Sequence, residues 1–474
     1  MANVKKILKE VLDEISPTKQ EKEKLKKLAE RAVKLANNLS KKYGAKAMLA
    51  GSITRDTWLL TKREFDVFIL FPEKMKEEEI EKFGLDIGKK VIKELGGEFK
   101  IEYAEHPYVS GLVNSVDIDI VPCYALKTLE KIKCAVDRTP FHVRYLEKNF
   151  PIKLSGEVRL LKQFLSANSM YGADAKTQGF SGYTCELLIM KFGSFLNLLE
   201  NAAKWEPGEV IDIEKFYSEE DYHFLRKKFK NQPLILIDPT DKNRNTAAAL
   251  SIYNFFKFKK LASEFLKNPS KSFFEFQKPK LITKEELEEK IRERGTKLIL
   301  LTFSPPKVVP DVLWPQLRKF AERLKNILEE KKYEFKVFGK DVYTNEKDLA
   351  LVLLEMEVSK LPAVQKVTGP LIFDLDDSKR FLEKHRDAIA VYVEDKFWVA
   401  EVKRKFLTAE EKILDSLKKP LEILKAKGIP SSIAESLVRG FEIFSEVEKI
   451  ANLIERDENI NAFIKKYFEK ERLA

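Results

Sequence analysis

The sequence predicts a multidomain protein of the α+β class. Its 474 residues exceed what one hydrophobic core usually supports, so we expect two to four domains. Within residues 1–150, short apolar runs of strand length alternate with segments of helical periodicity. Residues 157–267 carry apolar side chains mostly at i, i+3 and i+4, which is typical of packed helices. These patterns favour a mixed sheet with helices, followed by a helical central domain.

The first domain, residues 1–150, is predicted to open with two helices. The second is expected to begin at Ser16 and Pro17, with serine as the cap and proline in the first turn. A short buried strand follows and is broken by Gly51 and Ser52, and a helix is expected after that break. The expected strands are 46–50, 65–71, 98–104 and 116–121, and a further helix is expected over 74–95.

The central domain, residues 151–270, contains one expected strand, 234–237, which leads into a turn at 238–241 (DPTD). A looser charged segment at 268–295 suggests a domain boundary. The order of elements in residues 271–405 predicts a small α+β domain of ferredoxin-like type, and residues 406–474 predict a helical tail interrupted at 428–430. In the α+β domain, strands are expected at 297–303, 333–337, 349–357, 388–393 and 397–402, and helices at 310–331 and 377–385.

The composition suggests a polyanionic partner. Lys and Arg number 86 against 75 Asp and Glu, a net charge of +11. Such an excess is either a solvated Lys/Glu surface or a surface that neutralises phosphates, and charge does not choose between RNA, DNA and an anionic membrane. The abundance of Lys and Glu is also reported for heat-adapted proteins.

The three cysteines form no CxxC pair and only four histidines are present, which argues against a structural zinc site and a disulfide framework. A reduced cytoplasmic environment fits this usage. The N-terminal segment is charged and amphipathic, unlike a signal peptide. No stretch approaches ~20 consecutive apolar residues, so we expect no membrane span.

Residues 51–58 (GSITRDTW) predict a phosphate-binding turn. Gly51 lets the backbone approach a ligand closely, and amide groups at the start of the expected helix point toward an anion. Ser52 can add a hydroxyl donor, and Arg55 can add a fork of guanidinium donors.

Glu64 and Asp66 lie two residues apart on an expected strand, so both project from one face while Phe65 and Val67 point into the core. Two carboxylates at close range repel each other and usually need a cation. Oxygen ligands suit Mg²⁺, which takes its other ligands from water and substrate phosphates. Two such ions can activate an attacking hydroxyl and stabilise a leaving pyrophosphate.

A third carboxylate is expected on a neighbouring strand. Residues 116–122 (VDIDIVP) supply two candidates, Asp117 and Asp119, which share one strand face. Both remain open as the third ligand at this point. An isolated pair of acids is usually a solvated strand face, so the order of turn, paired acids and later paired acids is what favours nucleotidyl transfer.

This order resembles the DNA polymerase beta-type nucleotidyltransferase superfamily. Further motifs narrow the resemblance to the archaeal, class I CCA-adding enzymes, and it covers nearly the whole chain, most densely through residue 250. The motifs are 105–111 (EHPYVSG), 119–124 (DIVPCY), 135–142 (AVDRTPFH), 159–162 (RLLK), 179–183 (GFSGY) and 244–245 (RN).

The resemblance implies an enzyme that adds and repairs the 3′-terminal CCA of tRNA, using CTP and ATP without a nucleic-acid template. It implies Mg²⁺ held by Glu64, Asp66 and Asp119, with Asp119 preferred over Asp117 because it directly precedes Ile-Val-Pro. It also implies a nucleotide site in which Ser52 and Arg55 hold the triphosphate and Arg244 meets the base edge. The remaining implied nucleotide-binding residues are Thr139, His142, Lys162 and Tyr171.

Without the resemblance, the local sequence would predict a structural role for several of these residues. Lys162 would be a solvated lysine on an amphipathic helix, His142 a core or loop histidine, and Tyr171 a packing residue at the end of the same helix. Arg244 carries donors that suit the acceptors of both cytosine and adenine.

Beyond residue 250 the resemblance implies tRNA binding, largely by shape and phosphate contacts. Two lysine-rich helices, 226–230 and 256–260, interleave aromatic side chains with cations, as single-stranded RNA sites do, although packing of those aromatics in a core explains the pattern equally well. Two other functions stay open: a poly(A)-type or other RNA 3′-tailing enzyme, and an inactive RNA-binding protein. A homodimer is possible, and the sequence does not decide it.

Overall fold

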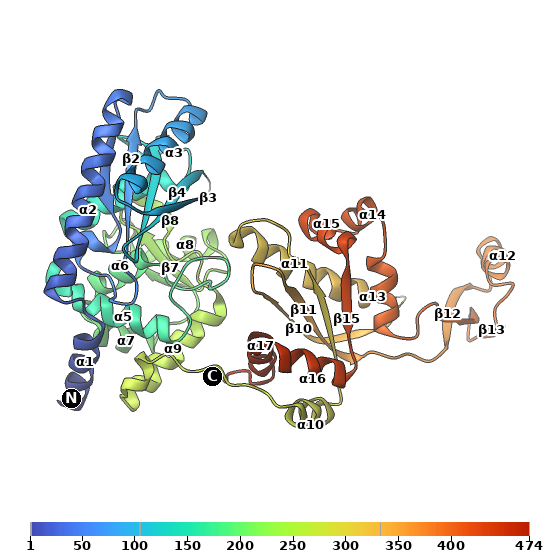
Figure 1. Cartoon of the computed structure of the whole chain (residues 1–474). Helices are drawn as coiled ribbons and strands as arrows, with labels where there is room; N and C mark the ends of the chain where they lie inside the picture. Colours follow the sequence, from blue (N-terminus) through green and yellow to red (C-terminus); the bar gives the residue numbers. More distant parts are fainter. Residues whose placement is uncertain (1, 104–105, 332, 474) are drawn as a thin grey trace. The chain divides into compact units, whose positions relative to one another are not determined.

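The computed structural model describes residues 2–103, 106–331 and 333–473, so Ala104 and Glu105 of the predicted elements and motifs lie outside it. The chain forms two compact units, Met1–Gln277 with Arg472–Ala474, and Lys278–Glu471 (Figure 1). The predicted mixed α+β class is confirmed, while the finer division into four domains stays a prediction. No helix within the described ranges combines the length and apolar character needed to cross a membrane.

A five-stranded sheet forms the N-terminal part of the first unit, in the order β1-β2-β5-β4-β3. Strands β2 and β5 pair in parallel and all other neighbours are antiparallel. Helices α2 and α3 pack on this sheet (Figure 1). The elements are α2 (Lys19–Ser40), β1 (Lys46–Ala50), β2 (Glu64–Phe71), α3 (Glu77–Glu94), β3 (Glu98–Tyr103), β4 (Pro107–Val113) and β5 (Val116–Tyr124).

Three local predictions in this region were wrong or incomplete. Helix α2 is capped by Thr18, because its hydroxyl accepts from the Glu21 amide while the Glu21 carboxylate accepts from the Thr18 amide, a reciprocal capping box; the predicted cap, Ser16, lies before it. The helix expected after Gly51 is one 3₁₀ turn, Ser52–Arg55. Strand β4 was missed.

The rest of the first unit is mostly helical, as predicted. Helix α1 (Ala2–Ile15) packs on α5 (Ser155–Ala167), and aromatic side chains such as Phe164 and Phe258 fill the core between the helices. The predicted strand is β7 (Leu234–Asp238), and the predicted turn joins it to β8 (Asp241–Asn245). The remaining elements are α4 (Thr139–Asn149), α6 (Gly182–Phe192), α7 (Phe195–Ala202), β6 (Glu209–Ile211), α8 (Tyr222–Lys228) and α9 (Ile252–Lys267).

The second unit has the predicted α+β character. One of its two sheets has the antiparallel strand order of a ferredoxin-like domain, and three further strands form a separate sheet. One sheet has the order β10-β11-β9-β15 and the other β12-β14-β13. Strand β10 begins at Lys336, beyond most of the predicted 333–337. The elements are α10 (Lys284–Arg294), β9 (Lys297–Phe303), α11 (Pro310–Leu328), β10 (Lys336–Thr344), β11 (Ala350–Val358), β12 (Val364–Leu371), α12 (Leu375–Lys384), β13 (Ala390–Glu394) and β14 (Phe397–Lys403).

The tail is helical from its cap at Thr408, as predicted, and its helices are interrupted at Gly428. It also contributes β15, which pairs with β9 and completes the first sheet of this unit. That strand was missed because four residues between helices carry too little periodic signal. The tail elements are α13 (Ala409–Leu417), α14 (Leu421–Ala426), α15 (Ser431–Arg439), β15 (Phe441–Phe444), α16 (Val447–Arg456) and α17 (Glu458–Phe468).

Candidate active site

Four carboxylates lie on one face of strands β2 and β5. The parallel register sets Glu64 opposite Asp117 and Asp66 opposite Asp119. The alternate residues Phe65 and Val67, like Ile118 and Ile120, are buried in the core, as the alternation predicts. Asp119 is partly buried beside Asp66, whereas Asp117 is exposed at the end of the face. The sheet therefore brings Glu64, Asp66 and both candidates for the third acid together.

The two central carboxyls interact strongly. Burial, and then the charges of Asp119 and Glu64, raise the pKa of Asp66 from its ordinary 3.8 to about 7, while Lys62 lowers it. Burial also raises the pKa of Asp119, and a hydrogen bond with Ser110 of β4 opposes that rise. Lys62 Nζ lies 2.9 Å from Oε1 of Glu64. Negative charge is thus concentrated on this face.

These side chains fit a site for a hard divalent cation. The donor set is carboxylate oxygen, which hard divalent cations prefer. Burial and, after it, repulsion from the neighbouring carboxylates raise the pKa of Asp66, and a bound cation would relieve that repulsion. Glu64, Asp66 and Asp119 are therefore suited to hold the ion, with Asp117 at the exposed margin.

Gly51 brings the main chain directly against this face. Its φ is +86° and its ψ is −177°, a backbone conformation that residues other than glycine rarely adopt. A Cβ added to Gly51 would lie 2.9 Å from Oδ2 of Asp66. The following 3₁₀ turn begins with Ser52, so the predicted phosphate-binding turn borders the acids.

A second group of site residues surrounds a buried ion pair. Arg55 Nη2 lies 2.9 Å from Oε2 of Glu186, and both side chains are almost fully buried. Thr57 Oγ1 donates to Oε1 of Glu186 over 2.6 Å. Lys162 Nζ donates to the carbonyl and hydroxyl oxygens of Thr57 over 3.1 and 3.3 Å. Lys162 is therefore part of a buried network, and not the solvated lysine that local sequence suggests.

Tyr171 completes this group but does not end helix α5, which stops at Ala167. It forms a β-bridge with Phe180 instead. Its hydroxyl lies near the N-terminus of α6, where a Cβ on Gly182 would be 3.2 Å from Tyr171 Oη and 3.7 Å from Lys162 Nζ. The charge of Glu64 acts on both Lys162 and Tyr171, so the group borders the acidic face.

Burial governs the titration of this group. Desolvation lowers the pKa of Lys162, and the negative charge of Glu186 opposes that effect. Burial raises the pKa of the Tyr171 hydroxyl well above its ordinary value. A negatively charged ligand near Lys162 would favour the charged ammonium.

A third group converges on Asp238, at the end of β7. His142 Nε2 lies 2.9 Å from Asp238 Oδ2, and Arg244 Nη1 of β8 donates to the same oxygen over 2.8 Å. Tyr183 Oη donates to Oδ1 over 3.2 Å, and its ring stacks on His142 with centroids 4.1 Å apart. Two of the predicted nucleotide-binding residues, His142 and Arg244, are therefore held by one carboxylate.

Asp238 is a stable anion in this setting. Its side chain is fully buried, and burial alone would raise its pKa. The hydrogen bond and charge of His142, with two further bonds from Thr240, outweigh burial and hold the pKa of Asp238 below its ordinary value. Thr139 lies one helical turn before His142, at the start of α4.

Sequence reasoning missed Glu186, and it noted Asp238 only as a turn residue. Glu186 stands as the single acid in the apolar helix GYTCELLIMKF. A lone buried acid in such a helix indicates a paired charge, and that signal was available. Asp238 ends a strand that is buried throughout, which is also an unusual place for an acid.

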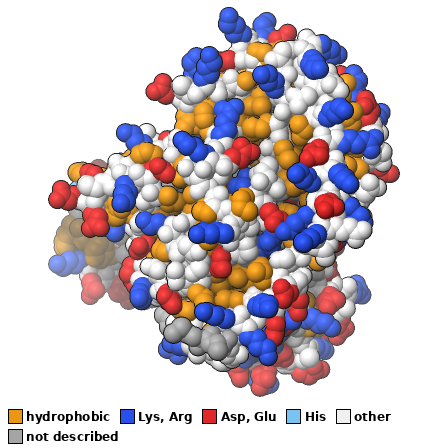
Figure 2. Space-filling model, turned by 90° about the vertical axis from the view of Figure 1, so that its left-hand side faces the viewer, with side chains coloured by type: hydrophobic (Ala, Val, Ile, Leu, Met, Phe, Trp, Pro, Cys, Tyr) orange, Lys and Arg blue, Asp and Glu red, His pale blue; other side chains and the backbone are white. Residues whose placement is uncertain are grey.

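For Phe258 and Phe229 of the two lysine-rich segments, the structure favours core packing, the alternative to base stacking. Phe258 is fully buried in the core, so its ring cannot stack on a base. Phe229 packs against a small apolar cluster, and Lys228 donates to Asn243. On the face shown in Figure 2, Lys and Arg side chains are interspersed with Asp, Glu and apolar patches.

Family models match most of the chain. A nucleotidyltransferase domain matches residues 32–152, the second domain of tRNA nucleotidyltransferase matches 156–275, and the C-terminal domain of CCA-adding enzyme matches 294–446. All the residues of the candidate active site fall within the first two matches.

Several full-length proteins are similar. The CCA-adding enzyme of Archaeoglobus fulgidus is 37% identical over 445 residues, covering 94% of this chain and 96% of that protein. The CCA-adding enzyme of Methanocaldococcus jannaschii is 40% identical, covering 81% and 84%. That of Methanopyrus kandleri is 34% identical, covering 100% and 98%.

Proposed function

The chain belongs to the CCA-adding enzyme family, and we propose that it adds CMP, CMP and AMP in turn to the tRNA 3′ end, without a nucleic-acid template, at the acidic face of β2 and β5. As a CCA tRNA nucleotidyltransferase it takes tRNA, CTP and ATP as substrates. The observation that carries the proposal is the parallel register that sets Asp66 beside Asp119, with Glu64 on the same face and Gly51 against it.

Glu64, Asp66 and Asp119 would hold magnesium. When bound, magnesium supplies positive charge that stabilises the attacking oxygen and the leaving pyrophosphate. Asp119 is favoured over Asp117 because it is directly opposite Asp66 and partly buried, while Asp117 is exposed.

The nucleotide would lie between the three groups of side chains. Ser52, Arg55 and Lys162 would contact the triphosphate, and Tyr171 and Thr139 would line the site. Arg244 would present its remaining guanidinium donors to the base edge while Asp238 orients it. His142, stacked on Tyr183 and bonded to Asp238, would be held in a fixed orientation.

In the reaction, the 3′ hydroxyl oxygen of tRNA forms a bond with the α-phosphorus of CTP or ATP. The bond from that phosphorus to the oxygen bridging toward the β-phosphate breaks, and pyrophosphate leaves. We expect a metal-ligating carboxylate, and not a histidine, to assist loss of the hydroxyl proton, because Nε2 of His142 is already bonded to Asp238.

The test is a stepwise extension assay on tRNA that ends at the discriminator base, with CTP and ATP supplied separately, with and without Mg²⁺. The wild-type protein should add two C residues, and then A. Asp66→Asn should abolish incorporation while its thermal unfolding and circular dichroism match the wild type. Near-normal addition by that variant would overturn the assignment of the site.

The same assay separates the other functions. Long adenosine tracts without C would identify a poly(A)-type tailing enzyme. Absence of magnesium-dependent pyrophosphate release, with tRNA binding retained, would identify an inactive RNA-binding protein.

A further inference from the structure

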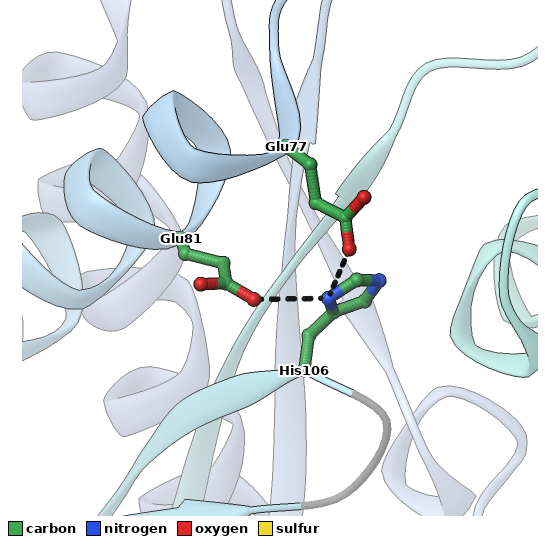
Figure 3. A group of neighbouring side chains, drawn as sticks. All are labelled: Glu77, Glu81 and His106. Carbon is green, nitrogen blue, oxygen red and sulfur yellow. Dashed lines mark hydrogen bonds and ion pairs between the residues drawn. The ribbon is translucent and has the colours of Figure 1, made fainter.

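A second group of metal-ligating side chains lies where helix α3 approaches strand β4. Glu77 and Glu81 are one helical turn apart at the start of α3, and His106 directly precedes β4. His106 Nδ1 lies 3.4 Å from Oε1 of Glu77 and 3.2 Å from Oε1 of Glu81. Figure 3 shows both carboxylates converging on the same ring nitrogen. None of these residues belongs to the active site described above.

An ion pair alone leaves net negative charge in this group. One ring nitrogen carries at most one proton, so a single N–H must serve two carboxylates. Even a protonated imidazole leaves one net negative charge among the three side chains. Glu78 and Glu79 add further negative charge in the same helical turn, and the partial positive charge of the helix N-terminus offsets only part of it.

The spacing of the ligand atoms fits a bound divalent cation. Bonds of about 2.0–2.1 Å in a tetrahedral site place neighbouring ligand atoms about 3.3 Å apart, close to the two observed distances. All three ligand atoms lie within 4.8 Å of one another. A cavity of about 10 Å³, lined by the three residues and by Pro122 and Cys123, adjoins them. That volume suits a single water as a further ligand.

We propose that Glu77, Glu81 and His106 bind a divalent cation of the zinc class and thereby tie the start of α3 to the start of β4. The imidazole nitrogen favours a borderline metal over Mg²⁺, so this site differs in chemistry from the all-oxygen active site. The sequence expectation against structural zinc rested on cysteine pairs and scarce histidines, whereas these ligands are two carboxylates and a single histidine. Strand β4 also carries Ser110, which hydrogen-bonds to Asp119. The cation would therefore stabilise the position of a strand that contacts the active site.

The experiment uses the full-length protein with Asp66→Asn, which weakens metal binding at the active site, after removal of metals by a chelator. Zn²⁺ is titrated calorimetrically, and X-ray absorption reports the ligands of the first bound equivalent. We expect one equivalent with an imidazole ligand and a higher melting temperature when zinc is present. When Glu81→Gln or His106→Gln is added to this protein, the affinity for the first equivalent of zinc should fall at least tenfold.

Glu78→Gln is the matched control, since Glu78 lies in the same helical turn outside the group. It should leave zinc affinity unchanged. Glu77→Gln removes a largely exposed ligand, so it reports on binding even if a more buried variant folds poorly. An all-oxygen ligand shell, unchanged affinity in the Glu77, Glu81 and His106 variants, or an equal loss with Glu78→Gln would overturn the proposal.

Discussion

At the residue scale, the geometry of the acidic face depends on the main chain of Gly51 as well as on the carboxylates of β2 and β5. Gly51 combines a positive φ with the contact that any Cβ would make with Asp66. A larger residue would strain the turn and displace the Asp66 carboxylate of the proposed metal site. The glycine is therefore required by both backbone geometry and site geometry.

Gly51→Ala is expected to lower kcat for CMP addition at least about tenfold, because small displacements of reacting groups are costly. The backbone strain should also destabilise the protein by about 1–3 kcal/mol. Single-turnover incorporation and thermal unfolding measure the two effects separately.

Gly193→Ala is the matched control. Gly193 also has a positive φ, +77°, but a Cβ there would meet no atom within 4 Å. It should lose stability through strain and keep its kcat. Equal kcat in the two variants would show that the contact between Gly51 and Asp66 has no catalytic consequence.

Single-residue predictions succeeded where the signal is local. The alternation of acids and apolar residues on β2 and β5 shows directly which side chains share a face of the sheet, because successive side chains of a strand point to opposite sides. The partners of Arg55 and His142 were not predictable in that way. Glu186 and Asp238 meet them only through the folded chain.

At the element scale, one buried carboxylate joins three elements of the second unit. Glu355 of β11 accepts two bonds from Arg294 of α10, at 2.6 and 3.0 Å, and one from Tyr467 of α17, at 2.7 Å. Burial alone would raise the pKa of Glu355, but these bonds and one from Thr296 outweigh burial and lower it below 4.5.

Glu355→Gln is expected to destabilise the second unit by about 1–3 kcal/mol at neutral pH. Breaking a buried pair is costly, and partial exposure of Arg294 reduces that cost. Because the folded-state pKa is lowered, the carboxylate stabilises the fold fully above pH 4.5 and loses that effect as the pH falls through the folded-state value. Denaturant unfolding at pH 7 and in steps below 4.5 should show the two proteins converging in acid.

Glu357→Gln is the control on the same strand, since Glu357 is exposed and pairs with Lys336 at the surface. It should change stability by less than about 1 kcal/mol at every pH. A gap between wild type and Glu355→Gln that does not narrow in acid would contradict the assigned role of the carboxylate.

The elements themselves were predicted unevenly. The long amphipathic pattern of α11 and the apolar run of β9 each predicted the right element, although α11 ends at Leu328 rather than at residue 331. The ferredoxin-like type was predicted correctly, but not all of the strands that form it. Strand β15 of the tail pairs with β9 as the fourth strand, whereas β12, β13 and β14 form a second sheet.

At the scale of the whole molecule, the residues of the proposed active site all lie in the first unit, which has its own cores. We expect a fragment of residues 1–277 to fold cooperatively and to bind CTP as the full chain does. The resemblance to CCA-adding enzymes implies that the rest of the chain carries most of the tRNA-binding surface. The KM for tRNA should therefore rise at least about tenfold in the fragment.

Calorimetric CTP binding and initial rates against tRNA concentration test this division. A fragment that does not fold, or one with an unchanged KM for tRNA, would contradict it. Whether the chain forms a homodimer is a separate question, and sedimentation of the full chain at several concentrations answers it.

Local sequence alone was sufficient for the acidic strands, the turn at Gly51 and the α+β class, because periodicity and turn chemistry act between near neighbours. Folding decided which carboxylate stands beside Asp66, and which acids hold Arg55 and His142. Those contacts join distant segments: Thr57 and Glu186, for example, are 129 residues apart and bond directly. Their formation depends on the register of strands and the packing of helices, which no local pattern encodes.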